Sequence, residues 1–278
     1  TSVFWLLITE LIGTLISINF KYYFLSETHL HYLKIHATVG LLGWFLMLIV
    51  GVGSTLLPMF LISHELNEKK LKLSYFLVNG GLVVAIVNWF TYKSSIADYV
   101  MAISIVAGIV CFMSYIFDSY KKRLRKKLDV GMLYSMIAMA AIFVPFILVG
   151  FVLFNFNLDT EFIYRITTLY GFSIIFGFIT TLILGQTYKT LPFIVWLYKY
   201  KALVGKAKTP LPRELYSEQI ANIQIVAYLL FVICMIIGLL INKVILIQIG
   251  SYLLLIVALL YNWNVLKIVL HNVKTEKL

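Results

Sequence analysis

Few side chains in this sequence have the chemistry to bind a metal or to move a proton. The histidines stand at His29, His31, His36, His64 and His271. His36 and His64 are 28 positions apart, which is about 42 Å along a helix, so they cannot bind the same metal ion. His36 lies inside an apolar segment, where a neutral imidazole is a candidate haem ligand or a buried group that is merely hydrogen-bonded.

Four other side chains within apolar segments can ionise or form hydrogen bonds. Glu10 lies in the first segment, and Gln186, Tyr188 and Lys189 follow one another in the sixth. Ionisable groups inside a membrane are costly and are therefore functional candidates. We expect Glu10 to be protonated or hydrogen-bonded toward the protein interior, and Lys189 to reach the membrane surface. Together the four define a candidate polar path.

The elements that position these residues are long apolar runs. Hydrophobic residues make up 62% of the 278-residue chain and charged residues 13%, about half the charge of a typical soluble domain. Each run is long enough for a membrane-spanning helix, and none has the alternation of a membrane strand. The sequence predicts an all-α polytopic membrane helix bundle of about eight transmembrane helices in a lipid bilayer, at 3–20, 33–62, 72–92, 97–117, 131–155, 163–196, 217–241 and 245–270.

The basic residues indicate the orientation of the predicted helices. With eight spans, 17 of the 23 basic residues fall on the membrane face that holds Thr1. Lys189 lies in a helix end, and the opposite face carries five basic residues, namely Lys21, Lys34, Lys93, Arg165 and Lys243. Such an excess marks the cytoplasmic side. We therefore expect a bacterial inner (cytoplasmic) membrane protein with cytoplasmic N- and C-termini. The net charge of +11 then reflects topology, and nucleic acid is not an expected partner.

The second and sixth spans share a pattern at a constant offset of 134 residues. Gly43, Gly51 and Pro58 recur as Gly177, Gly185 and Pro192. The offset predicts two four-helix repeats of parallel topology, at 1–117 and 131–278, joined by a basic cytoplasmic loop at 118–130.

The stretch from His36 to Trp44, followed by Gly51 and by Leu57-Pro58, resembles the second helix of subunit I in the haem-copper oxidase and nitric oxide reductase superfamily. The resemblance implies that His36 is an axial ligand of a haem b, with Gly40 and Gly43 leaving room for the macrocycle and Trp44 packing on its edge. The second ligand would be His29, His31, Tyr170 or a group from a partner membrane subunit, or the iron would be five-coordinate.

The departures from this superfamily exclude a complete oxygen or nitric oxide reductase. Subunit I has twelve helices in three repeats, and its sixth helix supplies a histidine to the catalytic metal. The sixth span here has Gln186 and Tyr188 but no histidine. Two hypotheses remain. The first is a non-catalytic haem-b protein for electron transfer, response to NO or O2, or oxidase assembly, alone, with a partner subunit or as a homo-oligomer. The second is a cofactor-free carrier or scaffold subunit that keeps the fold.

Overall fold

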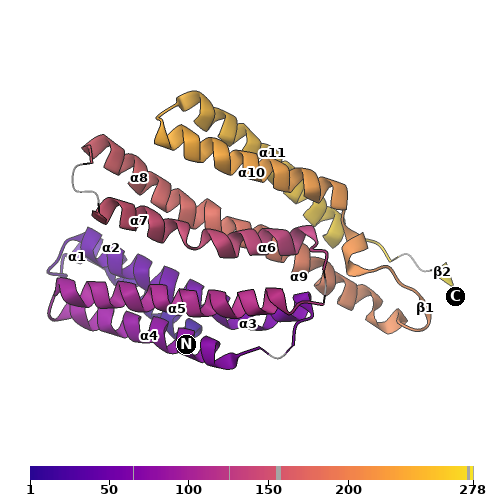
Figure 1. Cartoon of the computed structure of the whole chain (residues 1–278), viewed down its shortest axis with the longest axis horizontal. Coiled ribbons are helices and arrows are strands. Elements are labelled where there is room, and N and C mark those ends of the chain that lie inside the picture. Colours follow the sequence, from indigo (N-terminus) through magenta and orange to yellow (C-terminus); the bar gives the residue numbers. More distant parts are fainter. Residues whose placement is uncertain (65, 125, 155–157, 274–275, 278) are drawn as a thin grey trace. The chain divides into compact units, whose positions relative to one another are not determined.

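The computed structural model describes residues 1–64, 66–124, 126–154, 158–273 and 276–277, and the chain is 83% helical. Figure 1 follows the helices along the sequence. The contacts divide the chain into a first unit, Thr1–Lys126, and a second unit, Lys127–Leu278.

The first unit is built from four long helical segments. Helix α1 spans Ser2–Tyr22, α4 spans Glu68–Phe90 and α5 spans Ser95–Lys121. Between α1 and α4 runs a continuous segment of three parts, namely α2 (His29–Thr38), the π-helix η1 (Val39–Leu46) and α3 (Met47–Leu61). The core lies mainly where α4 packs on α5, through Val78, Leu82, Ala85, Ile105, Ile109 and Phe112.

The second unit has the same order of long segments. Its elements are α6 (Val130–Ala141), α7 (Val144–Phe154), α8 (Thr160–Phe172), the π-helix η2 (Ser173–Thr180), α9 (Thr181–Tyr200), α10 (Glu218–Leu240) and α11 (Val244–Val269). Short 3-10 turns, η3 (Lys201–Leu203) and η4 (Pro212–Leu215), follow α9. Strand β1 (Ala207–Lys208) pairs antiparallel with β2 (Glu276–Lys277).

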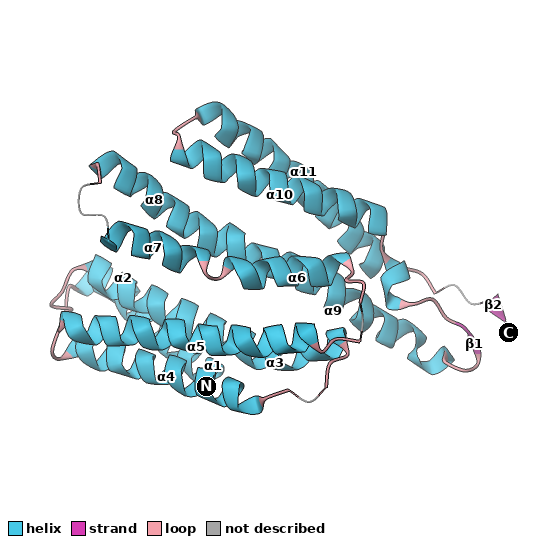
Figure 2. Ribbon diagram, in the orientation of Figure 1, coloured by secondary structure: helices cyan, strands magenta, loops and turns pink. Residues whose placement is uncertain are grey.

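A short break separates α6 from α7 within one predicted span, as Figure 2 shows. Pro145 is the second residue of α7. Proline has no backbone N–H and disfavours helical geometry in the residue before it, but it is well tolerated in the first turn of a helix. The break at 142–143 therefore follows from the position of Pro145.

The prediction of an all-α protein with eight long apolar helices is confirmed. In the part of the chain that the structure describes, eight helical segments have the length and composition to cross a membrane, and between 11% and 39% of an 18-residue apolar stretch of each is buried. Their exposed apolar faces suit contact with lipid. The second segment begins at His29 and the sixth extends over Thr160–Leu203, so both are longer than predicted. Residues 118–121, predicted to lie in the basic loop, form the last turn of α5.

The two π-helical segments occupy equivalent positions in the sequence repeat. Adding 134 to the bounds of η1, Val39–Leu46, gives Ser173–Thr180, the bounds of η2. π-Helical segments are rare and tend to occur at functional sites. The local structure of the two units therefore repeats with the same offset as the glycine and proline pattern.

Candidate functional site

The His36 side chain is held by the backbone of α1. Its Nδ1 lies 3.0 Å from the carbonyl oxygen of Thr9. Because a carbonyl oxygen only accepts hydrogen bonds, Nδ1 carries the proton in this contact. The other ring nitrogen, Nε2, is then the unprotonated base of the neutral imidazole.

Gly13 makes this position of the ring sterically accessible. A Cβ atom on Gly13 would lie 3.0 Å from Cε1 and 3.2 Å from Nδ1 of His36. The imidazole therefore rests against the bare backbone of α1, one helical turn from Thr9. Sequence analysis did not single out Gly13, because its role depends on how α1 crosses α2.

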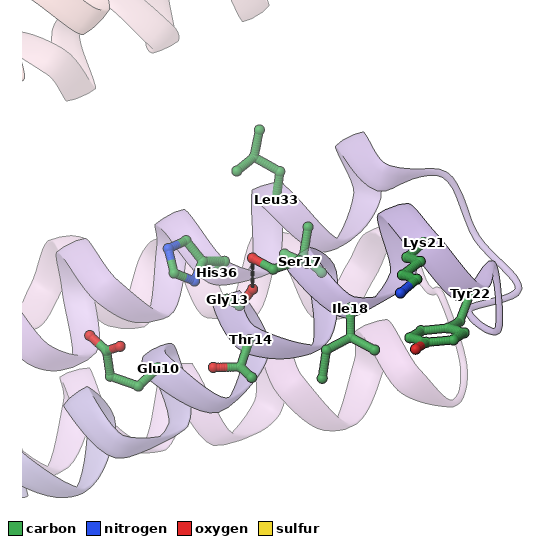
Figure 3. A pocket seen from close by; sticks show the side chains of 10 residues that line it. Glu10, Gly13, Thr14, Ser17, Ile18, Lys21, Tyr22, Leu33 and His36 are labelled. Atoms are coloured by element: carbon green, nitrogen blue, oxygen red, sulfur yellow. Dashed lines mark hydrogen bonds between the residues drawn. The ribbon is translucent and has the colours of Figure 1, made fainter.

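An open groove of about 700 Å³ lies beside His36. It follows one face of α1 and one side of α2 (Figure 3). The residues that line it are Glu10, Gly13, Thr14, Ile16, Ser17, Ile18, Lys21, Tyr22, Leu33 and His36. The groove thus combines one imidazole, one acid and one base with apolar and hydroxyl-bearing side chains.

Glu10 lines this groove from α1 (Figure 3). Its side chain is exposed, and no hydrogen bond or ion pair of its carboxyl group is found among the described residues. The expected hydrogen bond toward the interior of the helix bundle is therefore not formed within the first unit.

Gly40 and Gly43 do not open space beside His36. A Cβ atom on Gly40 would lie 3.1 Å from Cγ2 of Thr9, and one on Gly43 would lie 2.8 Å from Cγ of Trp5. Both glycines instead allow α1 to approach η1 closely. The Trp5 indole donates to Oδ1 of Asn79 at 2.8 Å, which fixes the side chain that fills the space.

The other predicted cofactor residues lie away from the groove lining. Trp44 makes an edge contact with Phe45, with ring centroids 6.2 Å apart. His29 stacks on Phe20 with centroids 4.4 Å apart, and His31 contacts the edge of the Tyr32 ring.

Tyr170 lies on α8 of the second unit and is 37% exposed. The described part of the chain contains no cluster of three or more histidine, cysteine or acidic side chains suited to a metal ion.

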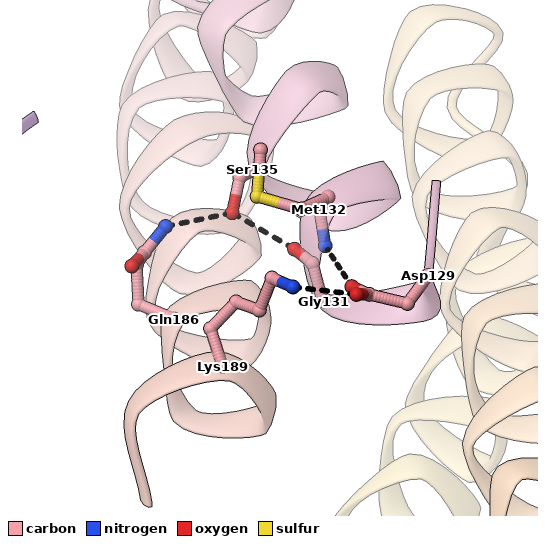
Figure 4. Close-up of polar contacts among 6 residues, drawn as sticks. All are labelled: Asp129, Gly131, Met132, Ser135, Gln186 and Lys189. Atoms are coloured by element: carbon pink, nitrogen blue, oxygen red, sulfur yellow. Dashed lines mark hydrogen bonds and ion pairs between the residues drawn. The ribbon is translucent and has the colours of Figure 1, made fainter. Parts of the chain in front are cut away.

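The polar residues of α9 are bonded to α6 within the second unit (Figure 4). Gln186 Nε2 donates to Oγ of Ser135 at 2.8 Å. Lys189 Nζ forms an ion pair with Asp129 at 2.5 Å, and the two side chains are only 10% and 15% exposed. Asp129 also caps α6 by accepting from the backbone N–H of Met132. Lys189 therefore has a defined acidic partner, which sequence analysis missed.

Tyr188 belongs to a buried network that joins α9 to α10 and α11. Its hydroxyl donates to Oε1 of Gln224 and accepts from Nδ2 of Asn264 at 3.3 Å. Gln224 and Asn264 are completely buried. Sequence analysis missed both, although amides within otherwise apolar spans were a visible signal. Within the described residues, the buried hydroxyl of Tyr134 and Nε2 of Gln224 make no direct hydrogen bond, although the two side chains interact with each other.

The loop ends of the first unit opposite Thr1 are joined by polar contacts. Lys93 donates to Glu27, and this ion pair holds the pKa of Glu27 below its usual value. Asp98 Oδ1 accepts from the Asn88 amide at 3.0 Å and from the Trp89 indole at 2.9 Å. These contacts fix α4 to α5 near the loop that precedes the His36 helix.

The fold defines the chain as a helical bundle with eight candidate membrane spans. No family model, curated protein or solved structure matches it significantly.

Proposed function

We propose that this chain is an integral membrane protein that binds a single haem b through His36. It would be a relative of oxidase subunit I that is not a complete oxygen or nitric oxide reductase by itself. The observation that supports this proposal is the hydrogen bond from Nδ1 of His36 to the Thr9 carbonyl. Histidine ligands of metals commonly donate their second ring N–H to such a group, which fixes the tautomer and the ring orientation.

The residues beside His36 fit a haem in size and character. The groove of about 700 Å³ is within the range of cofactor sites. Ile16, Ile18 and Leu33 supply apolar surface for a macrocycle. Nε2 of His36 supplies a basic lone pair, which is the form of imidazole that ligates iron. The groove along α1, rather than Gly40 and Gly43, would thus provide the room for the macrocycle.

A single protein ligand agrees best with the groove lining. His36 is the one histidine among the described residues that line it, and His29 and His31 are not among them. We therefore infer that His36 would be the ligand that this groove offers to the iron, and that a partner membrane subunit or a second copy of the chain would supply any further ligand. A bound haem with an open position supplies an iron that binds diatomic gases. Response to NO or O2 is then favoured over electron transfer and oxidase assembly.

The proposal includes two parallel four-helix repeats and cytoplasmic termini. The constant offset of 134 between η1 and η2 supports the repeat. The excess of basic residues on the face of Thr1 supports the orientation in a bacterial inner membrane.

The test is the visible spectrum of the full chain, purified in detergent after expression with an ample haem supply. We expect a Soret band, with α and β bands that sharpen on reduction by dithionite. His36→Ala should abolish these bands. The matched control is His64→Ala, because His64 is exposed in the loop that follows α3. A folded His36→Ala protein that keeps its full haem content would contradict the assignment.

The second candidate function is a cofactor-free membrane carrier or scaffold. The polar contacts of α9 favour it, since Gln186, Tyr188 and Lys189 all bind groups on neighbouring helices. Such contacts stabilise a helix bundle without any ligand. A folded wild-type protein with only the 280 nm absorbance of its aromatic side chains would support this candidate and exclude haem.

A further inference from the structure

The groove beside His36 has an acid toward one end and a base toward the other. Glu10 and Lys21 project from the same face of α1 (Figure 3). They are 11 residues apart, which corresponds to about 17 Å along the helix axis. Gly13, against which the His36 ring rests, is about one turn from Glu10 and about 12 Å from Lys21. A ligand bound at His36 therefore meets a carboxyl group in one direction and an ammonium group in the other.

Lys21 has no acidic partner among the described residues. Its Nζ lies 5.3 Å from the centroid of the Tyr22 ring, and its side chain is exposed in the last turn of α1. The ammonium group thus lies where the apolar helix ends. Glu10, in contrast, lies near the middle of the same helix.

Haem b carries two carboxylates on one edge of the ring and apolar substituents on the opposite edge. Carboxylates placed beside Glu10 would meet a like group in an apolar environment, where ionised groups are costly. At the Lys21 end they would meet an opposite charge near the surface. We infer that Lys21 pairs with the haem carboxylates, so that the groove accepts the cofactor with its apolar edge toward Glu10. This inference rests on the proposed function.

The test compares haem with its dimethyl ester, which lacks the two carboxylate charges. Haem-free full-length protein in detergent is titrated with each compound, and the dissociation constant is obtained from the Soret absorbance. The variants are Lys21→Gln and a matched control, Lys34→Gln. Lys34 is an exposed lysine on α2, with its Nζ 5.5 Å from the Trp89 ring, and it does not line the groove.

We expect Lys21→Gln to weaken haem binding about fivefold, the upper range for an exposed ion pair. The same variant should bind the dimethyl ester as the wild type does, and Lys34→Gln should match the wild type with both compounds. Equal losses for haem and its ester, or equal losses in the two lysine variants, would overturn the role of Lys21. Those outcomes leave the proposed function intact if His36→Ala still abolishes binding. A wild-type chain that binds neither compound would overturn the function and the inference together.

Discussion

Helices α6 and α9 approach each other more closely than a side chain would permit. A Cβ atom on Gly185 would lie 2.8 Å from the Gly131 carbonyl oxygen and 2.8 Å from Oγ of Ser135. A Cβ atom on Gly131 would in turn lie 2.9 Å from the Gly185 carbonyl oxygen. Two of these three neighbours are backbone atoms, which cannot move aside without shifting a helix. The perturbation that tests this crossing is Gly185→Ala.

Two effects of opposite sign determine the result of Gly185→Ala. Alanine in a helix is about 0.5–1 kcal/mol more favourable than glycine. Added volume in a tightly packed site costs about 1–3 kcal/mol, and contact with backbone places this site at the upper end. We therefore expect a net loss of about 2 kcal/mol. For a chain of this size, that loss corresponds to a decrease of about 4–8 °C in the midpoint of thermal unfolding.

The chain offers a matched control at the equivalent position of the repeat. Gly51 is separated from Gly185 by 134 residues, is exposed, and would have no atom within 4 Å of an added Cβ. Gly51→Ala should therefore leave the midpoint unchanged or raise it slightly. Both variants are heated in the same detergent, and unfolding is measured as the loss of the monodisperse fraction in size-exclusion chromatography. A Gly185→Ala midpoint equal to that of Gly51→Ala would refute the close helix crossing.

Two further outcomes test the buried polar groups and the orientation. Tyr134→Phe removes a buried hydroxyl that makes no direct hydrogen bond within the described residues, and it should lower thermal stability less than Tyr228→Phe does. Tyr228→Phe loses a bond to the Phe176 carbonyl and should cost about 1 kcal/mol. The reverse order would contradict the assigned hydrogen bonds. Reporter fusions after Lys127 should be cytoplasmic and those near Glu27 periplasmic, because the basic residues are concentrated on the face of Thr1. A periplasmic signal after Lys127 would invert the proposed topology.

The helices were predictable from sequence because their signal is local. Continuous apolar runs of membrane-spanning length define the eight segments, and the break at Pro145 could also have been read from the sequence. The pairing between elements was not predictable in this way. Lys189 and Asp129 are 60 residues apart, and nothing local in the sequence joins them.

In the candidate site, too, the residue types were predictable from sequence and the contacts between helices were not. His36 was identified by its residue type and apolar setting, but its hydrogen-bond partner is a backbone carbonyl, which every residue possesses. Gly40 and Gly43 were expected to leave room for a macrocycle, but sequence could not tell whether a cofactor or α1 would occupy the space. Gly13 was overlooked, because only the crossing of α1 and α2 gives it a role.

The π-helical segment η1 controls which face of its helix His36 occupies. Each residue of a regular α-helix turns the chain by about 100°, and a π segment accommodates a residue beyond the regular α-helical count. Deleting one residue from Val39–Leu46 would allow regular α geometry throughout the segment from His29 to Leu61. With α3 held in place, His36 would then keep its direction, because the π segment already absorbs that residue. Regular α geometry without a deletion would instead turn His36 about 100° away from the Thr9 carbonyl. The number of residues in this stretch is thus matched to its π-helical geometry, which sets the direction of His36, and the same relation between residue count and geometry applies to Ser173–Thr180.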